Sequence, residues 1–305
     1  MLFKLVSVDY EPLKFLIKEV GMISNRNGRA LEFALVEAFV CIYPNSRLVG
    51  NTSNDQIRDK ALFDLLSDDM KEYYRKNCYA FADWVSSNKV PKDNVVLIYR
   101  LTDQDAVKGD VTDIRLVSGE VTYNISLKHN HNAVKHQRPG NLFSQLGIVD
   151  KDGEKEYRDK IKDVSKDFYK TVSSFDTNQF SVIKSIDENI INNFYSNMCA
   201  LVAYTINTQP VDINSTFRFL VGNCDFDKVI ITKDSVHVME FSGIAIPRYL
   251  KATQTAYNRV HLEFDNGFKF DMRLHTASSK FEIGKTISQK FDTQLIEHNI
   301  NSFSI

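Results

Sequence analysis

An aspartate and a lysine stand on two neighbouring predicted strands, and their chemistry fits phosphodiester hydrolysis. Asp113 opens the first strand, a Ser118-Gly119 turn follows, and Lys128 lies near the end of the second strand. A carboxylate can bind Mg²⁺, which polarises a phosphate and lowers the pKa of its bound water. A lysine can orient the attacking water and offset the developing negative charge. The pair predicts metal-assisted hydrolysis of a phosphodiester.

Alternation of apolar and polar residues predicts the hairpin that carries this pair. Residues 121–128 place Val, Tyr, Ile and Leu on one face and a polar row, which ends in Ser126 and Lys128, on the other. Ile114 and Leu116 form the apolar face of the first strand. The serine-glycine turn favours an antiparallel return. We therefore expect the aspartate and the lysine on adjacent strands.

The residue two positions before the lysine affects how a metal would be held. Ser126 carries a neutral hydroxyl, which is a poor Mg²⁺ ligand, so the site binds one metal or takes a second acid from elsewhere. Glu32 is one candidate because it lies over the apolar face of a predicted helix, although a position at the flank of that face would leave it in solvent. Asp110 is either a further ligand or part of a turn with Gly109.

A basic, histidine-rich run follows the predicted catalytic lysine. It holds three of the seven histidines of the chain. These histidines lack the cysteines and the spacing of a structural zinc site, so contact with DNA phosphates is the favoured role. The residues of this run that we expect to bind DNA are His129, Asn130, His131, Lys135, His136, Gln137 and Arg138.

Three parts of the sequence resemble nuclease motifs. Asp113 with Ser126-Leu127-Lys128 resembles the PD-(D/E)XK motif, from which Ser126 departs. Residues 128–138 look like the segment that follows the catalytic lysine in HaeIII-type restriction endonucleases. Residues 270–280 resemble an Arg-x-His-x-Ala-Ser-Ser block near the end of several restriction enzymes.

This resemblance implies a type II restriction endonuclease that uses Mg²⁺ to cut double-stranded DNA at a short palindrome. GGCC is the typical target of the family, which also pairs each nuclease with a cognate DNA methyltransferase. Nucleases of this kind often bring a glutamate from an N-terminal helix toward the metal, here Glu32. Cutting both strands of a palindrome calls for two sites related by a two-fold axis, so we expect a homodimer.

Base-specific contacts are expected from the C-terminal part of the chain. Arginine or lysine reads guanine in the major groove, with about 1–3 kcal/mol of discrimination per good bidentate contact. Arg273, on the polar face of a predicted hairpin strand, is the first candidate. For each candidate, a solvated surface position is the alternative. The other candidates are Arg248, His275, Ser278, Ser279 and Lys280.

The order of predicted elements indicates an α/β (α+β) fold, with a mixed central sheet flanked by helices and a β-rich C-terminal part. The resemblance implies a PD-(D/E)XK nuclease core. We divide the chain into a helical region plus nuclease core over 1–210 and a DNA-recognition part over 211–305. Helices are expected over most of 11–85, over 151–170 and over 182–206. Strands are expected over 94–100, 217–221, 229–232, 236–241, 260–264 and 268–274.

Composition limits the class of protein. With 305 residues and 43% hydrophobic content the chain can bury a large core. No apolar stretch is long enough to cross a membrane, and the start of the chain is broken too early by charge to be a signal peptide. Four scattered cysteines fit a reducing compartment, so we expect a cytoplasmic protein. A net charge of −1 argues against a protein that only coats DNA, but not against an enzyme with a basic cleft.

Two other functions fit the same residues. A non-sequence-specific or repair-type nuclease of the same core would keep Asp113 and Lys128. A catalytically inactive DNA-binding protein, in which Ser126 marks a decayed site, would bind DNA without cutting it. The alternative without any function is that Asp113 is only a turn residue and Lys128 only a solvated residue on a strand.

Overall fold

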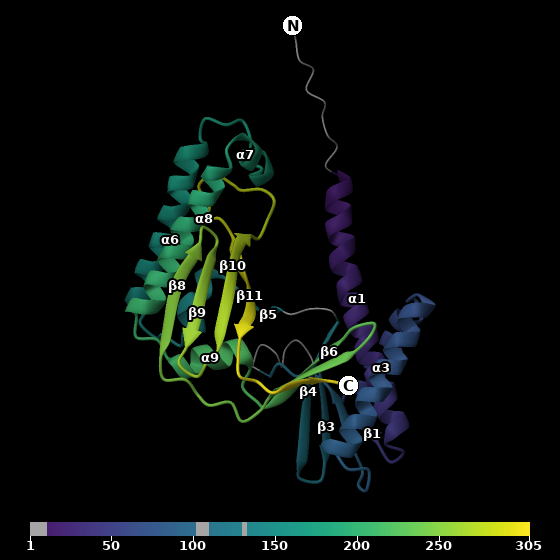
Figure 1. The fold of residues 1–305 in the computed structure, drawn as a ribbon. Coiled ribbons are helices and arrows are strands. Elements are labelled where there is room, and N and C mark those ends of the chain that lie inside the picture. The colour runs from purple at the N-terminus through teal and green to yellow at the C-terminus, as the bar shows by residue number, and fades with distance from the viewer. Residues whose placement is uncertain (1–10, 102–109, 130–132) are drawn as a thin grey trace. The chain divides into compact units, whose positions relative to one another are not determined.

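The chain is described by a computed structural model over residues 11–101, 110–129 and 133–305 (Figure 1). It forms two compact units, each assembled from segments that are distant in sequence. Unit 1 comprises Met1–His131, Cys224–Ser242 and Asn301–Ile305, and unit 2 comprises Asn132–Asn223 and Gly243–Ile300. Residues 211–305 contribute to both units. The division of the chain at residue 210 into a catalytic part and a recognition part stays a prediction.

A seven-stranded mixed sheet forms the centre of unit 1, in the order β1-β2-β3-β4-β6-β7-β12. The pairs β1–β2 and β4–β6 are parallel and the other pairs are antiparallel. The predicted hairpin is β3–β4, and Gly119 turns it with a φ of 59°. The strands are β1 (Arg47–Leu48), β2 (Leu97–Arg100), β3 (Ile114–Ser118), β4 (Val121–His129), β6 (Phe226–Ile231), β7 (Val236–Phe241) and β12 (Ser302–Ser304).

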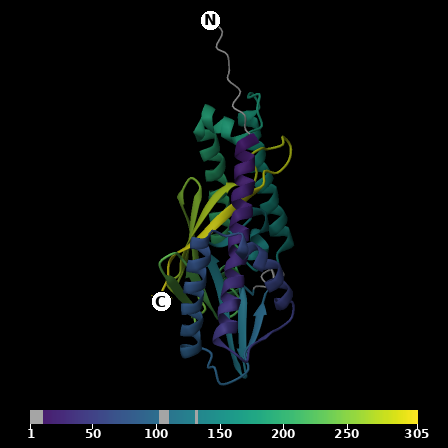
Figure 2. The same ribbon diagram turned by 90° about the vertical axis from the view of Figure 1, so that its right-hand side faces the viewer.

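Three helices of unit 1 are α1 (Glu11–Ile42), α2 (Thr52–Asp64) and α3 (Asp68–Asn88). Helices α1 and α3 lie alongside each other and contact strands β4 and β6, respectively (Figure 2). Ser67 caps α3 by accepting a hydrogen bond from the Met70 amide.

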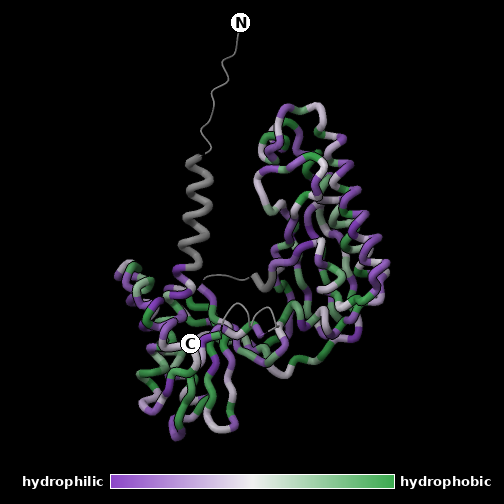
Figure 3. The backbone as a smooth tube through the Cα atoms, turned by 180° about the vertical axis from the view of Figure 1, so that it is seen from behind, coloured by the Kyte–Doolittle hydropathy of each residue, from purple (hydrophilic) through white to green (hydrophobic). Residues whose placement is uncertain are grey.

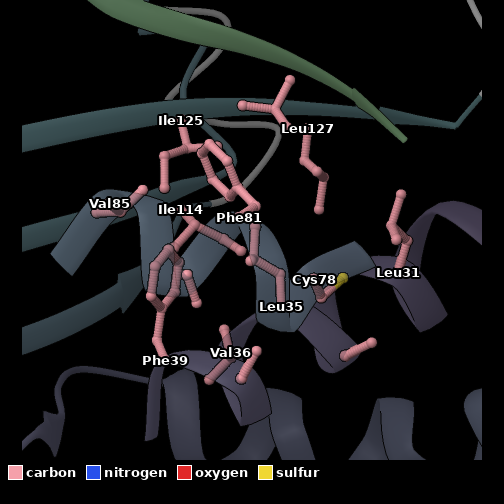
Figure 4. Packing of buried hydrophobic residues seen from close by; sticks show 14 of the residues in the cluster. Leu31, Leu35, Val36, Phe39, Cys78, Phe81, Val85, Ile114, Ile125 and Leu127 are labelled. Carbon is pink, nitrogen blue, oxygen red and sulfur yellow. The ribbon is translucent and has the colours of Figure 1, made fainter. Parts of the chain in front are cut away.

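The core of unit 1 forms between these helices and the apolar face of the hairpin (Figure 4). Leu35 of α1 and Phe81 of α3 meet Ile114 and Ile125, and all four are fully buried. The alternation predicted for β3 and β4 is therefore confirmed on the apolar side, except at Val121, which is exposed. On the other side, Asn124 and Ser126 are also buried, whereas Thr122 is exposed and Lys128 is partly exposed.

Unit 2 contains a five-stranded antiparallel sheet in the order β5-β11-β10-β9-β8. Helix α8 packs across β8, β9 and β10, and α6 packs against α8. Figure 3 shows α6 mainly in hydrophilic colours, as expected for a helix that buries one stripe and exposes the rest. The strands are β5 (Ala133–Gln137), β8 (Leu250–Ala256), β9 (Arg259–Phe264), β10 (Lys269–Thr276) and β11 (Gln289–Glu297). The helices are η1 (Pro139–Asn141), α5 (Leu142–Gln145), α6 (Lys151–Val172), α7 (Phe180–Ile186), α8 (Glu188–Thr208) and α9 (Ile213–Val221).

The prediction for residues 217–221 was wrong: this segment is helical and belongs to α9. Asp212 caps that helix through the Ser215 amide, at 3.0 Å. Phe217, Leu220 and Val221 are buried at the spacing of one helix face. A run of five largely apolar residues fits the period of a strand as well as that of a helix. The N-cap at Asp212 favours the helix.

The other predicted elements are present, with changed ends. The 182–206 run is two helices, because Asp187 ends α7 and caps α8 by accepting from the Asn189 amide. The hairpin around Asn266-Gly267 joins β9 and β10, with Gly267 at a φ of 89°. The mixed α/β class is confirmed. No helix in the described ranges is long and apolar enough to span a membrane.

Candidate active site

Asp113 and Lys128 meet at the open end of the β3–β4 hairpin. The Asp113 amide donates to the Ile125 carbonyl at 2.8 Å, which continues the ladder by one residue beyond β3. The Asp113 Oδ2 atom then accepts from the Leu127 amide at 2.6 Å and from Lys128 Nζ at 3.0 Å. Both side chains are partly exposed, at 26% and 34%, so a ligand can reach them. The structure brings together the pair that the sequence singles out.

Ser126 lies beside the same carboxylate. Its hydroxyl is 3.4 Å from Asp113 Oδ2, at the far limit of a hydrogen bond. The residue is 4% exposed. The serine therefore lines the site as a neutral neighbour of the carboxylate.

Glu32 reaches this site from α1. Burial raises the pKa of its carboxyl group, the Arg100 guanidinium acts against this rise, and the Asp113 carboxylate adds to it. Lys128 also lowers this pKa, so the charges of Asp113 and Lys128 both act on Glu32. A cation between two partly buried carboxylates stabilises them, because it offsets their mutual repulsion.

An arginine that the sequence did not single out holds Glu32 in place. Arg100 ends β2 with its side chain only 4% exposed, and it forms ion pairs with Glu32 and with Asp59, the latter at 2.9 Å. Its NH1 atom also lies 3.4 Å from Gln56 Oε1. Asp59 and Gln56 belong to a polar face that α2 buries. The sequence offered one signal for Arg100: it ends an apolar strand, and a charge in such a position needs buried partners.

A second lysine lies next to Ser126. Strands β4 and β6 are parallel, and Lys228 of β6 is the direct partner of Ser126. Burial, together with the nearby Lys128 charge, lowers the pKa of Lys228 to about 8. The sequence prediction began this strand at residue 229 and so left Lys228 outside it.

Asp110 takes part in a different group of contacts. Its carboxylate accepts from the Thr112 amide at 3.1 Å and forms an ion pair with Arg115 of β3. Burial would raise the pKa of Asp110, but these hydrogen bonds and the Arg115 charge lower it. Arg115 also donates to Asn124 at 2.6 Å. The structure thus pairs Asp110 with Arg115.

The carboxylates of the site suit a hard divalent cation. Oxygen donors are what Mg²⁺ prefers, and it keeps several waters, so one or two carboxylates and a phosphate complete its shell. Asp113 and Glu32 supply such donors. Across the part of the chain that the structure describes, no cluster of three or more His, Cys, Asp or Glu side chains has the arrangement of a metal site.

Comparison with known proteins identifies the family. The sequence matches the HaeIII restriction endonuclease family over residues 28–253. The chain belongs to that family. The Type II restriction enzyme HaeIII of Haemophilus aegyptius is 27% identical over 315 residues, which cover 90% of this chain and 94% of that enzyme. No solved structure matches.

Membership in the HaeIII restriction endonuclease family confirms the resemblance to HaeIII-type enzymes drawn from the run that follows the hairpin. The chain is therefore an enzyme of the restriction endonuclease class. The matched range includes Glu32, Asp113, Lys128 and Lys228.

The histidine-rich run is divided between the two units of this HaeIII-family chain. His129 ends β4, where its Nε2 atom lies 2.8 Å from the Tyr73 hydroxyl, and burial lowers its pKa. Asn130 and His131 lie outside the described residues, as does the side chain of Lys135. In unit 2, Gln137 is buried and accepts from the Thr293 hydroxyl at 2.5 Å.

Arg138 follows β5 and is exposed. Its NH1 atom donates to the Ser288 hydroxyl at 2.9 Å. The guanidinium is therefore oriented toward the start of β11 while part of it stays in solvent.

Three predicted DNA-binding residues gather around one carboxylate of unit 2. Asp292 of β11 contacts His136 at 2.7 Å, His275 at 2.9 Å and Arg273 at 3.3 Å. His136 and Arg273 are its direct partners on β5 and β10, so these side chains share one face of the sheet. Burial would raise the pKa of Asp292, but His275, Arg273 and His136 lower it. We call these four residues the Asp292 cluster.

The remaining predicted DNA contacts are exposed positions elsewhere in unit 2. Arg248 precedes β8, and its amide donates to Asp265 at 2.9 Å. Ser278 donates to the Lys280 carbonyl, and the Ser279 carbonyl accepts from the Phe180 amide at 3.2 Å. The contacts of Ser278 and Ser279 hold the segment after β10.

Proposed function

We propose that this chain is a Mg²⁺-dependent type II restriction endonuclease that makes double-strand cuts at a short palindrome. The 3.0 Å contact between Asp113 and Lys128, in a chain of the HaeIII family, carries the proposal. The local geometry supports assignment of unit 1 to the PD-(D/E)XK nucleases. GGCC, typical of the family, is the first sequence to test.

Each residue of the site has a distinct role in this proposal. Asp113 and Glu32 would hold the Mg²⁺, which when bound polarises the phosphate and makes its water more acidic. The Leu127 amide fixes the Asp113 carboxylate at 2.6 Å. Lys128 donates toward the attacking water and the charged phosphate oxygens. Arg100 keeps Glu32 directed toward the site.

The Asp292 cluster is the proposed recognition site. Arg273 is 53% exposed, and its ion pair with Asp292 limits the orientations of its guanidinium. A guanidinium fixed in this way fits bidentate contact with guanine. We propose further a homodimer on the palindrome, a cognate DNA methyltransferase as the functional partner, and a cytoplasmic location. The division into a catalytic part over 1–210 and a recognition part over 211–305 belongs to the same proposal.

Plasmid cleavage tests the proposal. Purified protein is incubated with unmethylated plasmid and Mg²⁺, and the ends of the products are mapped. We expect discrete fragments with one sequence at every end, and no cleavage in EDTA. If the DNA stays intact with every divalent metal tested, the proposal that the chain cleaves DNA is refuted. Fragments without a common end sequence would indicate a non-sequence-specific or repair-type nuclease.

Ser126 favours one competing function, a catalytically inactive DNA-binding protein. In that case the chain would bind duplex DNA and leave it intact in Mg²⁺. A Ser126→Asp variant separates the cases further, because a decayed site gains activity when the acid is restored. An active wild-type protein excludes this alternative.

A further inference from the structure

A second arginine lies directly beside Arg273 on the polar face of the unit 2 sheet. Strands β9 and β10 run side by side (Figure 1), and Arg259 of β9 is the direct antiparallel partner of Arg273. Directly paired residues extend from the same face of a sheet. On the other face, Val260 and Met272 are buried, and α8 packs against these strands. The two arginines therefore extend away from this core, on the face that carries the Asp292 cluster.

Arg259 is held by a carboxylate of its own. Asp271 of β10, which is 5% exposed, forms an ion pair with the NH1 atom of Arg259. His261, the direct partner of Asp271 on β9, lies 3.2 Å from the other carboxylate oxygen. This arrangement repeats that of the Asp292 cluster, where one aspartate also contacts an arginine and histidines.

Two guanidinium groups in direct cross-strand pairing do not favour the stability of the sheet. Like charges directly opposite each other on antiparallel strands are destabilising. Both side chains also keep much of their surface in solvent, 41% for Arg259 and 53% for Arg273. A guanidinium has five N–H donors, so an ion pair through one nitrogen leaves donors for a further partner. The pair therefore suits a ligand that presents several acceptors in a row.

Stacked guanines in the major groove of DNA present acceptors in such a row. Each guanine offers O6 and N7, and an arginine can contact both at once. Neighbouring strands lie about 4.8 Å apart and neighbouring base pairs about 3.4 Å apart, a small difference for long side chains. A pair of β-strands also fits into the major groove. Phosphates are less suitable partners, because the aspartate beside each arginine repels a negative oxygen, whereas the guanine acceptors are neutral.

We infer that Arg259 is a second specificity-determining residue, which reads a guanine on the base pair next to the one that Arg273 reads, with Asp271 as its positioning residue. The inference rests on the proposed function, in which Arg273 reads guanine. It makes β9 and β10 the reading strands of unit 2. It also predicts that the recognised sequence contains two G·C pairs in succession.

Binding to altered duplexes tests the role of Arg259. The duplex carries the sequence mapped by plasmid cleavage, each base pair is changed in turn, and EDTA prevents cutting. For Arg259→Ala we expect the preference for the cognate duplex to fall by about 5- to 150-fold at one G·C pair and to change little at the others. Arg158→Ala is the matched control, because Arg158 of α6 also pairs with a carboxylate and is 49% exposed. It should discriminate like the wild type.

Two conservative variants test the same contact with less disturbance of the fold. Arg259→Gln keeps a donor for Asp271, and glutamine pairs with adenine in the major groove, so the preference at that base pair should move from G·C toward A·T. Asp271→Asn keeps the shape of the side chain and removes its charge. It should weaken discrimination at the same base pair and at no other, because Asp271 acts through Arg259.

A modified duplex tests the inference with the wild-type protein. Replacing guanine by 7-deazaguanine removes the N7 acceptor and leaves the base pair intact. The wild type should bind about tenfold more weakly when either of two guanines on neighbouring base pairs is replaced. With Arg259→Ala, replacement of one of them should cost nothing further, because that contact is already lost, and replacement of the other should still weaken binding.

The outcomes separate this inference from the proposed function. If the wild type cuts at a defined sequence in which no two neighbouring base pairs are sensitive to 7-deazaguanine, the inference is wrong and the proposed function stands. A uniform loss of affinity of folded Arg259→Ala for every duplex would assign Arg259 to phosphate contact and would also overturn the inference. If the wild type cuts nothing, the proposed function is wrong, and duplexes selected by binding from a random pool supply the sequence for the same measurements. If no duplex is selected, both proposals fail.

Discussion

The hairpin site of unit 1 and the Asp292 cluster of unit 2 both place a carboxylate beside basic side chains, and they differ in how many of these contact it. Asp113 contacts a single lysine, and Glu32 beside it has a raised pKa. Asp292 contacts three basic side chains, and its pKa is lowered. The first arrangement favours uptake of a cation. The second is already neutralised and serves to hold its basic groups in place.

The two sites also differ in the sequence distance that they bridge. Lys128 follows Asp113 by 15 residues, whereas His136 and Asp292 are 156 residues apart. A short hairpin keeps its geometry through local pairing, but the cluster requires β5, β10 and β11, which are distant in sequence, to pair. We therefore expect the two sites to respond differently to substitution: chemistry should be lost in unit 1 and selectivity in unit 2.

The largest expected effect is on the chemical step. Asp113→Asn and Lys128→Ala should each lower single-turnover cleavage by about 1,000-fold or more, because each removes a charge that acts at the reacting phosphate. Duplex affinity in EDTA should change by less than about tenfold, as one contact among many is lost. Lys233→Ala is the control. Near-normal cutting by either variant would mean that the active site lies elsewhere.

The sequence predicted the parts of this site that depend on local pattern. Alternation and a turn were sufficient to place Asp113 beside Lys128, because hairpin register follows from the turn. Lys228 could not be found in this way, because the parallel register of β4 and β6 joins residues that are far apart in the chain. Arg100 was missed for a related reason: its partners on α1 and α2 are set by tertiary packing. Those same contacts leave Glu32 close enough to the Asp113 carboxylate for its charge to act on Glu32.

Arg100 gives the next largest effect, on stability rather than on chemistry. Arg100→Met leaves the partly buried Glu32 without its cation, while the fully buried Asp59 keeps Arg58 at 2.6 Å as a second partner. Removing one partner of a buried ion pair costs about 3–5 kcal/mol of unfolding free energy. Chemical denaturation measures this loss. Arg273→Met, which removes an exposed ion pair in unit 2, is the matched control and should cost less than about 1 kcal/mol. Equal losses would remove the distinction between the two regions.

Arg273 provides the corresponding test of unit 2. Arg273→Ala should reduce the preference for the cognate site over a site with one altered base pair by about 1–3 kcal/mol. The rate at saturating enzyme on the cognate site should stay within about tenfold of the wild type, since Arg273 does not act on the reacting phosphate. Competition binding with cognate and altered duplexes measures the discrimination. A uniform loss of affinity for every sequence would instead assign Arg273 to phosphate contact.

The smallest expected effect is on the pH dependence of stability. As pH falls, the contribution of one carboxyl group to stability should rise and that of the other should fall. The pKa of Glu32 is raised, so the folded state takes up its proton first, and the contribution of Glu32 to stability grows as pH falls through that raised pKa toward 4.5. The pKa of Asp292 is lowered, so its contribution is complete above pH 3.8 and is lost as pH falls through the lowered value.

Denaturation in EDTA of wild type, Glu32→Gln and Asp292→Asn between about pH 3 and pH 7 separates the two, because only a pKa that differs between folded and unfolded states makes stability depend on pH. Relative to its variant, the wild type should gain stability on acidification at Glu32 and lose it at Asp292. The same sign at both would mean that the two carboxylates have equivalent surroundings, and the contrast between a cation-binding site and a neutralised cluster would fail.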